Sequence, residues 1–348
     1  MGALFPMTPL NTLGELGLIN RIQQATPDPV QPSTRQGIGD DAAVFTIDEQ
    51  TLGLLSTDML VEGVHFDLTY VPLRHLGYKA VAVNVSDIAA MNGLPTQLTV
   101  SIGLSSRFTV EAVDELYAGI RAACEAYGVD LVGGDTTSSR SGLLISVAVL
   151  GRVDAGRITY RRTARPNDVI CVTGDLGAAY MGLQLLEREK QEYMANPDMQ
   201  PALSEERAYL IGRQLRPDGR TDIVHELRDL DIVPTAMIDI SDGLASELLH
   251  LCTQSSTGAV IFDENIPIDD QTYLAADEFK LSPITAALNG GEDYELLFTL
   301  PPQAFETLKN HSRITAIGYM TNTPGHVVLA TKAGQQTPIR AQGWAKTQ

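Results

Sequence analysis

Apolar and polar residues alternate in short runs along the first part of the chain, and this pattern predicts a mixture of strands and helices. "AAVF" looks like a strand, and "VDLV" looks like a short strand that runs into the loop "GGDTTSS". Several successive strands in one region favour an antiparallel or mixed sheet. The longer strands are expected at 51–57, 96–104 and 142–153, and the helices at 74–92 and 110–127.

A strand, a glycine turn and a helix follow one another twice in the second part, in "NDVICVTGDLGAAYMGLQLLE" and in "TAMIDISDGLASELLHLC". Further strands are expected at "GAVIF", "YELLFTL", "ITAIGYM" and "HVVLA", with a helix near 303–310, whereas 188–222 is polar and hard to place. We therefore expect an α/β (α+β) chain of two domains, 1–154 and 155–348, divided in "GRVDAGR".

Composition and charge narrow the functions that the chain can have. Its 348 residues carry a formal net charge of −18, which disfavours binding to nucleic acid. No run approaches the roughly 20 apolar residues of a membrane span. The N-terminal segment lacks the basic residues of a signal peptide, and its Leu16, Ile19 and Ile22 fall at helical spacing. The three cysteines form no metal or disulfide pattern, so a cytoplasmic protein without membrane partners is expected.

Aspartates stand beside several of the expected strands. Any one of them reads most simply as a turn residue or a helix cap. Together they are more informative, because ligands collect at strand ends in α/β sheets and Mg²⁺ prefers oxygen ligands. The aspartates are Asp40 and Asp41 in "GIGDD", Asp58 in "LLSTD", Asp135 in "LVGGD", and Asp239 and Asp242 in "MIDISDG".

Asp87 is a further candidate, because it sits in the apolar helix "AVAVNVSDIAAM". Asn84 precedes it by three residues and shares its helical face. A solvent-facing polar stripe is the simple alternative, but an unpaired buried carboxylate would carry a large desolvation cost. No P-loop, protein-kinase, H-E-x-x-H or G-x-S-x-G motif is present. Phosphate chemistry in so acidic a chain would therefore use carboxylate-bound Mg²⁺.

The order of these motifs resembles one enzyme family. "GIGDDAAV", "STDMLVEGVHF", "YKAVAVNVSDIAAMNGLP", "LVGGDTT", "IDISDGL" and "GGEDYELLF" are similar to the motif series of thiamine-monophosphate kinases, in the superfamily of aminoimidazole ribonucleotide synthetases. The resemblance implies a homodimer in which N-terminal strands pair into a barrel-like sheet, with a C-terminal α/β domain that completes the cleft. It also implies that ATP and thiamine phosphate react to give ADP and thiamine diphosphate with Mg²⁺.

The resemblance also assigns roles to individual residues. Because the accepting phosphate is already ionised near neutral pH, no catalytic general base is expected. Asp40 is a weaker metal candidate, and the neighbouring Arg162 leaves the position of the nucleotide-binding arginine open. The implied metal ligands are Asp41, Ser56, Thr57, Asp58, Asp87, Asp135, Asp239 and Asp242. The implied ATP contacts are Tyr117, Gly134, Asp135, Arg161 and Ser241, and the implied thiamine contacts are His65, Glu292 and Trp344.

Two alternatives stay open at this point. One is another ATP-dependent enzyme of the superfamily, similar to aminoimidazole ribonucleotide synthetase. The other is a non-catalytic nucleotide sensor on the same fold. Selenophosphate synthetases, which use a reactive residue near the N-terminus, fit poorly because the first cysteine is Cys124. Hydrogenase-maturation relatives, which use a C-terminal cysteine, fit poorly because the chain ends "GWAKTQ".

Overall fold

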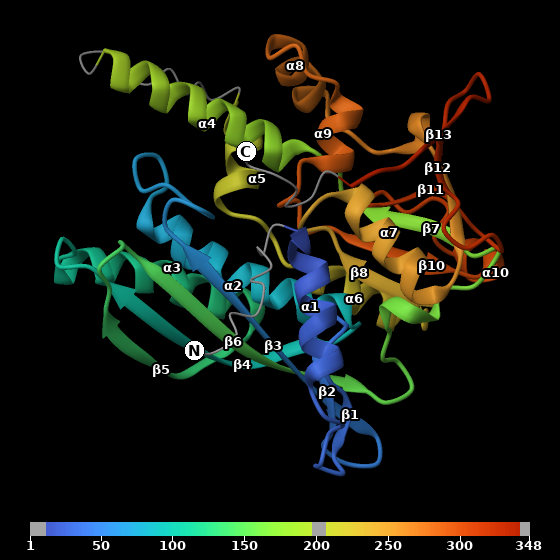
Figure 1. Cartoon of the computed structure of the whole chain (residues 1–348), viewed down its shortest axis with the longest axis horizontal. Coiled ribbons are helices and arrows are strands. Elements are labelled where there is room, and N and C mark those ends of the chain that lie inside the picture. Colours follow the sequence, from blue (N-terminus) through green and yellow to red (C-terminus); the bar gives the residue numbers. More distant parts are fainter. Residues whose placement is uncertain (1–11, 197–206, 342–348) are drawn as a thin grey trace, which may run out of the picture.

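The computed structural model describes residues 12–196 and 207–341, which form two β-sheets with helices around them (Figure 1). The expected α/β class is therefore confirmed. The first sheet uses strands between Thr34 and Asp154, and the second uses strands between Val169 and Pro338. The domain boundary near 154 stays a prediction.

The first sheet has six strands in the order β1-β2-β3-β6-β4-β5. Neighbouring strands are antiparallel, except that β4 and β5 are parallel. Side chains along β3 and β6 alternate between buried and more exposed, as expected for a sheet that is covered on one face. The strands are β1 (Thr34–Gln36), β2 (Ala43–Thr46), β3 (Thr51–Val61), β4 (Leu94–Leu104), β5 (Asp130–Ser138) and β6 (Leu144–Asp154).

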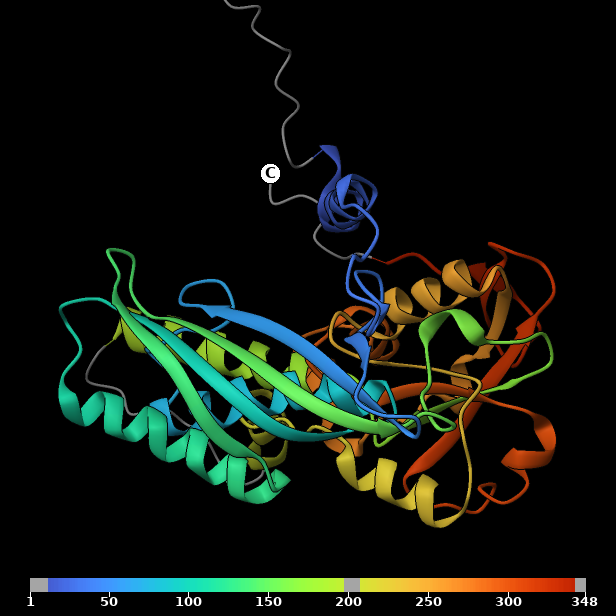
Figure 2. The same cartoon turned by 90° about the horizontal axis from the view of Figure 1, so that it is seen from below.

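Helices α2 (Leu73–Ala90) and α3 (Val110–Tyr127) lie along one face of this sheet (Figure 2). The two helices can approach closely because each has a glycine at the contact. A Cβ atom at Gly77 would lie 2.0 Å from the Leu116 carbonyl oxygen, and one at Gly119 would lie 1.9 Å from that of Arg74. Helix α2 also packs on strand β8 (Ala236–Asp239) of the second sheet, so its polar residues lie near the junction between the two halves.

The second sheet has seven strands in the order β13-β12-β9-β11-β7-β10-β8. All of its pairings are antiparallel except the one between β12 and β9. Its strands are β7 (Val169–Thr173), β8 (Ala236–Asp239), β9 (Gly258–Phe262), β10 (Leu296–Leu300), β11 (Ile314–Thr321), β12 (Val327–Ala330) and β13 (Gln336–Pro338).

The helices of the second half surround this sheet, and α1 (Gly14–Ala25) stands apart from both sheets in Figure 2. No helix within 12–196 and 207–341 has the length and apolar character needed to cross a membrane. The remaining helices are α4 (Ala178–Ala195), α5 (Ala208–Leu215), α6 (Thr221–Asp229), α7 (Leu244–Ser255), α8 (Asp270–Glu278), α9 (Pro283–Asn289) and α10 (Pro302–Phe305).

Three elements differ from the sequence-based expectations. The "GGDTTSS" segment continues strand β5 instead of forming a loop, because it pairs in parallel with β4. Strand β3 does not end before Asp58 but continues to Val61, paired along its whole length with β6. The helix near 303–310 is a single turn, Pro302–Phe305. Of the segment 188–222, the described residues form the end of α4, helix α5, the connection 216–220 and the start of α6.

Candidate active site

Three carboxylates from distant parts of the sequence meet beside the C-terminal half of α2. Asp41 lies just before β2, Asp87 lies in the last turn of α2, and Asp239 ends β8. One oxygen of each lies within 4.8 Å of one oxygen of the others. Asp41 and Asp239 are buried, with exposed fractions of 7% and 3%. Asp87 is half-buried and faces the other two carboxylates, so these side chains form one cluster, which we call the acid cluster.

Hydroxyl groups fix the orientation of the acid cluster. Ser86, one residue before Asp87, donates a hydrogen bond of 2.6 Å to Asp239 Oδ2 and so connects α2 to the second sheet. Ser56 on β3 donates to Asp87 Oδ2. The backbone N–H of Asp58 donates to Asn84 Oδ1 at 3.0 Å. Strand β3 is thereby held against α2 with Ser56 and Asp58 on the same side.

Burial and mutual repulsion make the acid cluster a poor place for several negative charges. Burial, followed by the charge of Asp41, raises the pKa of Asp239 to about 7 and that of Asp58 to about 6. Burial, followed by Asp58 and Asp239, raises the pKa of Asp87 well above its ordinary value. The pKa of Asp40 rises to about 7 through burial and the charge of Asp41. A cation bound among these carboxylates would strongly favour their ionised forms.

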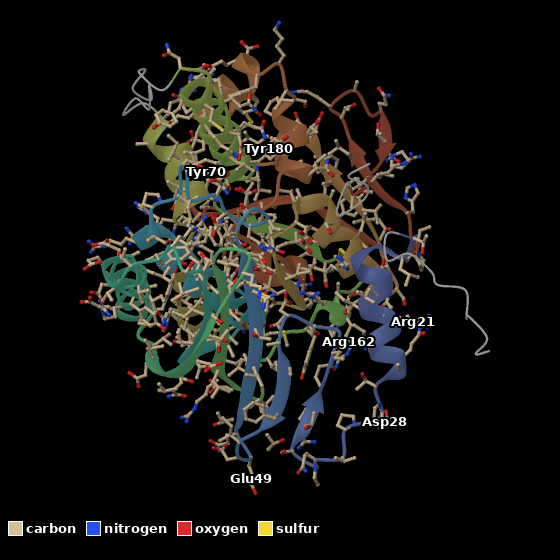
Figure 3. All side chains as sticks on the ribbon, turned by 60° about the vertical axis from the view of Figure 1, so that its left-hand side comes forward. Arg21, Asp28, Glu49, Tyr70, Arg162 and Tyr180 are labelled. Atoms are coloured by element: carbon tan, nitrogen blue, oxygen red, sulfur yellow. The ribbon has the colours of Figure 1, made fainter. Side chains whose placement is uncertain are left out.

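Arg161 contacts a carboxylate of the acid cluster, whereas the contacts of Arg162 lie outside the cluster. Arg161 donates from Nε to Asp41 Oδ2 at 2.9 Å and from Nη2 to Asp41 Oδ1. Arg162 stacks on the Tyr160 ring, with 4.3 Å between the guanidinium carbon and the ring centroid, and donates to Gln36 at 2.9 Å. Figure 3 shows Arg162 near the N-terminal helix. Arg161 is therefore the arginine of this pair that contacts the acid cluster.

Ser241 and Asp242 follow β8 in the "ISDG" turn, immediately before α7. The Asp242 backbone N–H donates to Glu247 Oε1 at 3.1 Å. Burial, followed by the charge of Glu292, raises the pKa of Asp242. Burial, followed by Asp242, raises the pKa of Glu247 well above its ordinary value. The turn thus extends the acidic surface from the acid cluster toward the "GGEDYELLF" loop.

The "GGEDYELLF" loop carries Glu292 to the same region. Tyr294 in this loop is buried, and the burial raises its pKa well above the ordinary value, with a further increase from the charges of Glu292 and Asp58. Glu292 forms an ion pair of 2.9 Å with Lys79 on α2. Lys79 also lines a small cavity together with His65, which is exposed. Lys79 therefore pairs with Glu292 and also lines the cavity in which His65 lies.

Several sequence-based candidates lie outside this group. Thr57 points to the opposite face of the sheet from Ser56, and its hydroxyl donates to the Val147 carbonyl oxygen at 2.8 Å. Gly134 and Asp135 are on the exposed edge strand β5, three strands from Asp58 and roughly 14 Å away at ordinary strand spacing. Tyr117 packs half-buried on α3. Trp344 lies outside the described residues.

Sequence reasoning missed four polar residues that shape the site. Ser86, Lys79 and Glu247 are buried on helices, and Gln214 is buried on α5. Ser86 and Lys79 carried a weak signal, because they are polar residues in the otherwise apolar helix that already drew attention to Asp87. Glu247 and Gln214 carried no such signal, because the sequence does not show which residues pack against them.

The first half of the chain has the fold of an AIR synthase-related domain. The family model "AIR synthase related protein, N-terminal domain" matches residues 39–153, which contain most of the first sheet and both of its covering helices.

Similarity over the whole chain identifies the family. The thiamine-monophosphate kinase of Bacillus subtilis (strain 168) is 37% identical over 329 residues, which cover 92% of this chain and 95% of that protein. That of Aquifex aeolicus (strain VF5) is 36% identical over 335 residues, with coverage of 96% and 98%. The structure of AaThiL complexed with AMPPCP and TMP superposes with a TM-score of 0.81 and 34% identity, and the match covers 96% of this chain and 97% of that one. The chain belongs to the thiamine-monophosphate kinase family.

Proposed function

We propose that the region around the acid cluster is the phosphoryl-transfer site of a kinase that converts ATP and thiamine phosphate to ADP and thiamine diphosphate. The convergence of Asp41, Asp87 and Asp239 from three separate elements carries this proposal. A relative solved with AMPPCP, which is an ATP analogue, and with TMP supports both substrates. Family membership supports the same reaction.

The chemistry requires charge neutralisation more than proton transfer. The nucleophile is an oxygen of the substrate phosphate, whose second pKa is about 6, so it is ionised at neutral pH without a general base. The enzyme has to align two polyanions and stabilise the charge that develops between them. Arg161 is a cation that contacts the acid cluster, and we assign it to the ATP phosphates. Ser241 in the "ISDG" turn is assigned to the nucleotide as well.

The donor set fits Mg²⁺. Asp41, Asp87 and Asp239 offer hard oxygen ligands on rigid elements, and Ser56 and Asp58 stand beside them. Asp40 Oδ2 is buried and has no hydrogen-bond partner among the described residues, although Arg162 Nη1 lies 3.7 Å from it. Bound there, Mg²⁺ would neutralise phosphate charge and polarise the transferred group. We assign Asp242 to the same metal-binding surface. The assignments of Thr57, Gly134, Asp135 and Tyr117 stay predictions.

A second, unlike surface would hold the cationic rings of thiamine phosphate. Glu292 supplies negative charge beside Lys79, and 26% of its side chain is exposed. His65 lines the same small cavity as Lys79 and is exposed. An aromatic face such as that of Trp344 would suit a cationic heterocycle. The acid cluster and these residues together match a substrate that is negative at one end and positive at the other.

We also propose a homodimer formed by the uncovered face of the first sheet. Met59 and Leu55 on β3 and Leu150 on β6 expose 54%, 44% and 38% of their surface on this face. Strand β5 is an exposed edge along its whole length. The change Met59→Glu should therefore produce a monomer in light scattering at micromolar concentration. The control Val110→Glu, on helix α3, should leave the dimer intact, and a monomeric unmodified protein would contradict the proposal.

A cytoplasmic location is proposed on two grounds. The reaction consumes ATP, and the cysteines of the chain, Cys124, Cys171 and Cys252, are buried free thiols. Free thiols are typical of a reducing compartment.

The reaction itself is tested by product analysis. Purified protein is incubated with ATP, thiamine phosphate and Mg²⁺, and thiamine diphosphate and ADP are separated and quantified. Equal amounts of the two products are expected, and a chelator should stop their formation. ATP consumption without thiamine diphosphate would favour another enzyme of the superfamily, and ATP binding without turnover would favour a nucleotide sensor.

A further inference from the structure

Lys79 is a charged residue in a place where charge is costly. It lies on α2 between Tyr78 and Ala80, and only 4% of its side chain is exposed. Fourteen residues of this helix are buried, so the lysine has apolar neighbours along most of its length. A buried ammonium group is tolerated only with specific partners, and those partners indicate its role.

The partners of Lys79 hold one carboxylate from two sides. Lys79 Nζ lies 2.9 Å from Glu292 Oε1 and donates at 3.1 Å to the backbone carbonyl oxygen of Gln214. The side chain of Gln214 donates from Nε2 to Glu292 Oε2 at 2.5 Å. Both oxygens of Glu292 are therefore fixed, one by the first half of the chain and the other by helix α5. The unused lone pairs of the carboxylate stay available to a ligand.

The backbone conformation of the loop that contains Glu292 is held in place by hydrogen bonds. Glu292 has a φ of 59° and Tyr294 a φ of 51°, a conformation that non-glycine residues rarely adopt. The Glu292 backbone N–H donates to the Ser241 carbonyl oxygen at 2.6 Å, and that of Tyr294 donates to the Ile240 carbonyl oxygen at 2.8 Å. Strain of this kind persists where the surroundings enforce it, and it is frequent at functional sites.

A small cavity adjoins the ion pair. Lys79, Gln214, His65 and Tyr70 are among its lining residues. Tyr70 stands beside helices α4 and α5 in Figure 3 and donates to Glu187 of α4 at 2.7 Å. Gln214 Oε1 is buried and has no hydrogen-bond partner among the described residues, so an acceptor stays available next to the ion pair.

We propose that Lys79 is a positioning residue that holds the carboxylate of Glu292 in the orientation that receives the cationic part of thiamine phosphate. Lys79 acts through Glu292 and does not contact the transferred phosphoryl group. The inference rests on the proposed function, since it needs Glu292 to contact that substrate. The proposal adds a residue that affects the binding of thiamine phosphate and leaves the binding of ATP unchanged.

The test compares the KM values of the two substrates. Lys79→Met removes the charge and keeps similar volume, so it should raise the KM for thiamine phosphate about tenfold or more, because hydrogen bonds to charged groups are the strong ones. The KM for ATP should stay within about twofold of the unmodified value. Lys190→Met is the matched control, because Lys190 lies near the Tyr70 ring but pairs with Asp67 at 2.8 Å. That variant should leave both KM values unchanged.

A double variant separates positioning from a structural role. If Lys79 acts through Glu292, the combination of Lys79→Met with Glu292→Gln should be no worse for thiamine phosphate than Glu292→Gln alone. It should also fold if the single Lys79→Met variant does not, because neither partner of the ion pair is then charged. Additive losses, equal changes in both KM values, or a double variant that fails to fold would each overturn the proposal. Turnover by the unmodified protein, measured first, tests the proposed function separately.

Discussion

Replacing Asp239 with asparagine should make the metal-free protein more stable and abolish its phosphoryl transfer. Asp239 is 3% exposed, ends β8, and lies in the acid cluster beside Asp41 and Asp87. An asparagine oxygen can still accept the hydrogen bond that Ser86 donates at 2.6 Å. The substitution therefore removes a charge and a metal ligand while it keeps the contact between α2 and the second sheet.

The magnitude follows from the pKa of Asp239. Burial, followed by the charge of Asp41, raises this pKa from 3.8 to about 7. Each pH unit of difference corresponds to about 1.4 kcal/mol, so ionised Asp239 destabilises the metal-free fold by at most about 4 kcal/mol. For a chain of this length, removal of that cost raises Tm by at most about 5 °C, at roughly 2.1 cal/mol/K of unfolding entropy per residue.

The pH dependence has a definite sign. Because the pKa is raised in the folded state, the folded protein binds this proton more tightly than the unfolded chain does. The free energy of unfolding of the unmodified protein therefore falls as pH rises from about 4 to about 7, and the cost stays at its full value above that range. The gain from Asp239→Asn should be largest above pH 7 and should vanish near pH 4.

The assay is thermal unfolding at pH 8 and at pH 4.5, with a chelator and then with Mg²⁺. In chelator at pH 8 the variant should melt above the unmodified protein, and the difference should shrink at pH 4.5. Free Mg²⁺ at about 100 times its dissociation constant stabilises a one-site protein by about 2.7 kcal/mol, and the variant should lose most of that gain. Asp229→Asn, at an exposed position on α6, is the control and should change neither result. A variant that melts below the unmodified protein in chelator, or that gains as much from Mg²⁺, would refute the reasoning.

Three further predictions concern the metal, the nucleotide and the thiamine rings. Asp58→Asn should nearly abolish turnover with an unchanged circular dichroism spectrum, and near-normal turnover at ordinary Mg²⁺ would contradict the metal assignment. Arg161→Met should raise the KM for ATP about tenfold, as expected for the loss of a charge-assisted hydrogen bond, whereas Arg162→Met should change it by less than about twofold. The reverse order would show that the wrong arginine has been assigned. Trp344→Ala should raise the KM for thiamine phosphate roughly 2- to 30-fold through loss of a cation–π contact, and an equal change for ATP would indicate a packing role.

Most of the fold could be predicted from residue periodicity. Helix α3 begins and ends where the amphipathic pattern predicts, at Val110 and Tyr127, and a Thr109 side chain caps its first turn. Strand β5 could not be predicted in full, because its glycines and small polar residues read as a loop. Its extended form comes from parallel pairing with β4, a tertiary contact that overrides local preference.

Part of the acid cluster could be predicted from the sequence. Asp87 was informative because an aspartate is rare in an apolar helix, and the structure places it beside Asp41 and Asp239. The "STD" motif implied Thr57 as a metal ligand together with its two neighbours. Strand alternation, however, puts its side chain on the opposite face from Ser56 once β3 is known to continue to Val61.

Pairings across the two halves were the part that sequence reasoning could not reach. Lys79 and Glu292 are more than two hundred positions apart in the printed sequence, and nothing local marks them as partners. Arg161 and Arg162 are adjacent and chemically identical, so only their contacts with Asp41 and Tyr160 distinguish them.

The most direct test of the central claim is the stoichiometry of thiamine diphosphate formation in the unmodified protein and in Asp239→Asn. With ATP, thiamine phosphate and Mg²⁺, the unmodified protein should form one thiamine diphosphate for each ADP, and the variant should form neither at a comparable rate. Thiamine diphosphate formation that continues at a normal rate in the variant, or ADP release by the unmodified protein without thiamine diphosphate, would contradict the claim that the acid cluster carries this transfer.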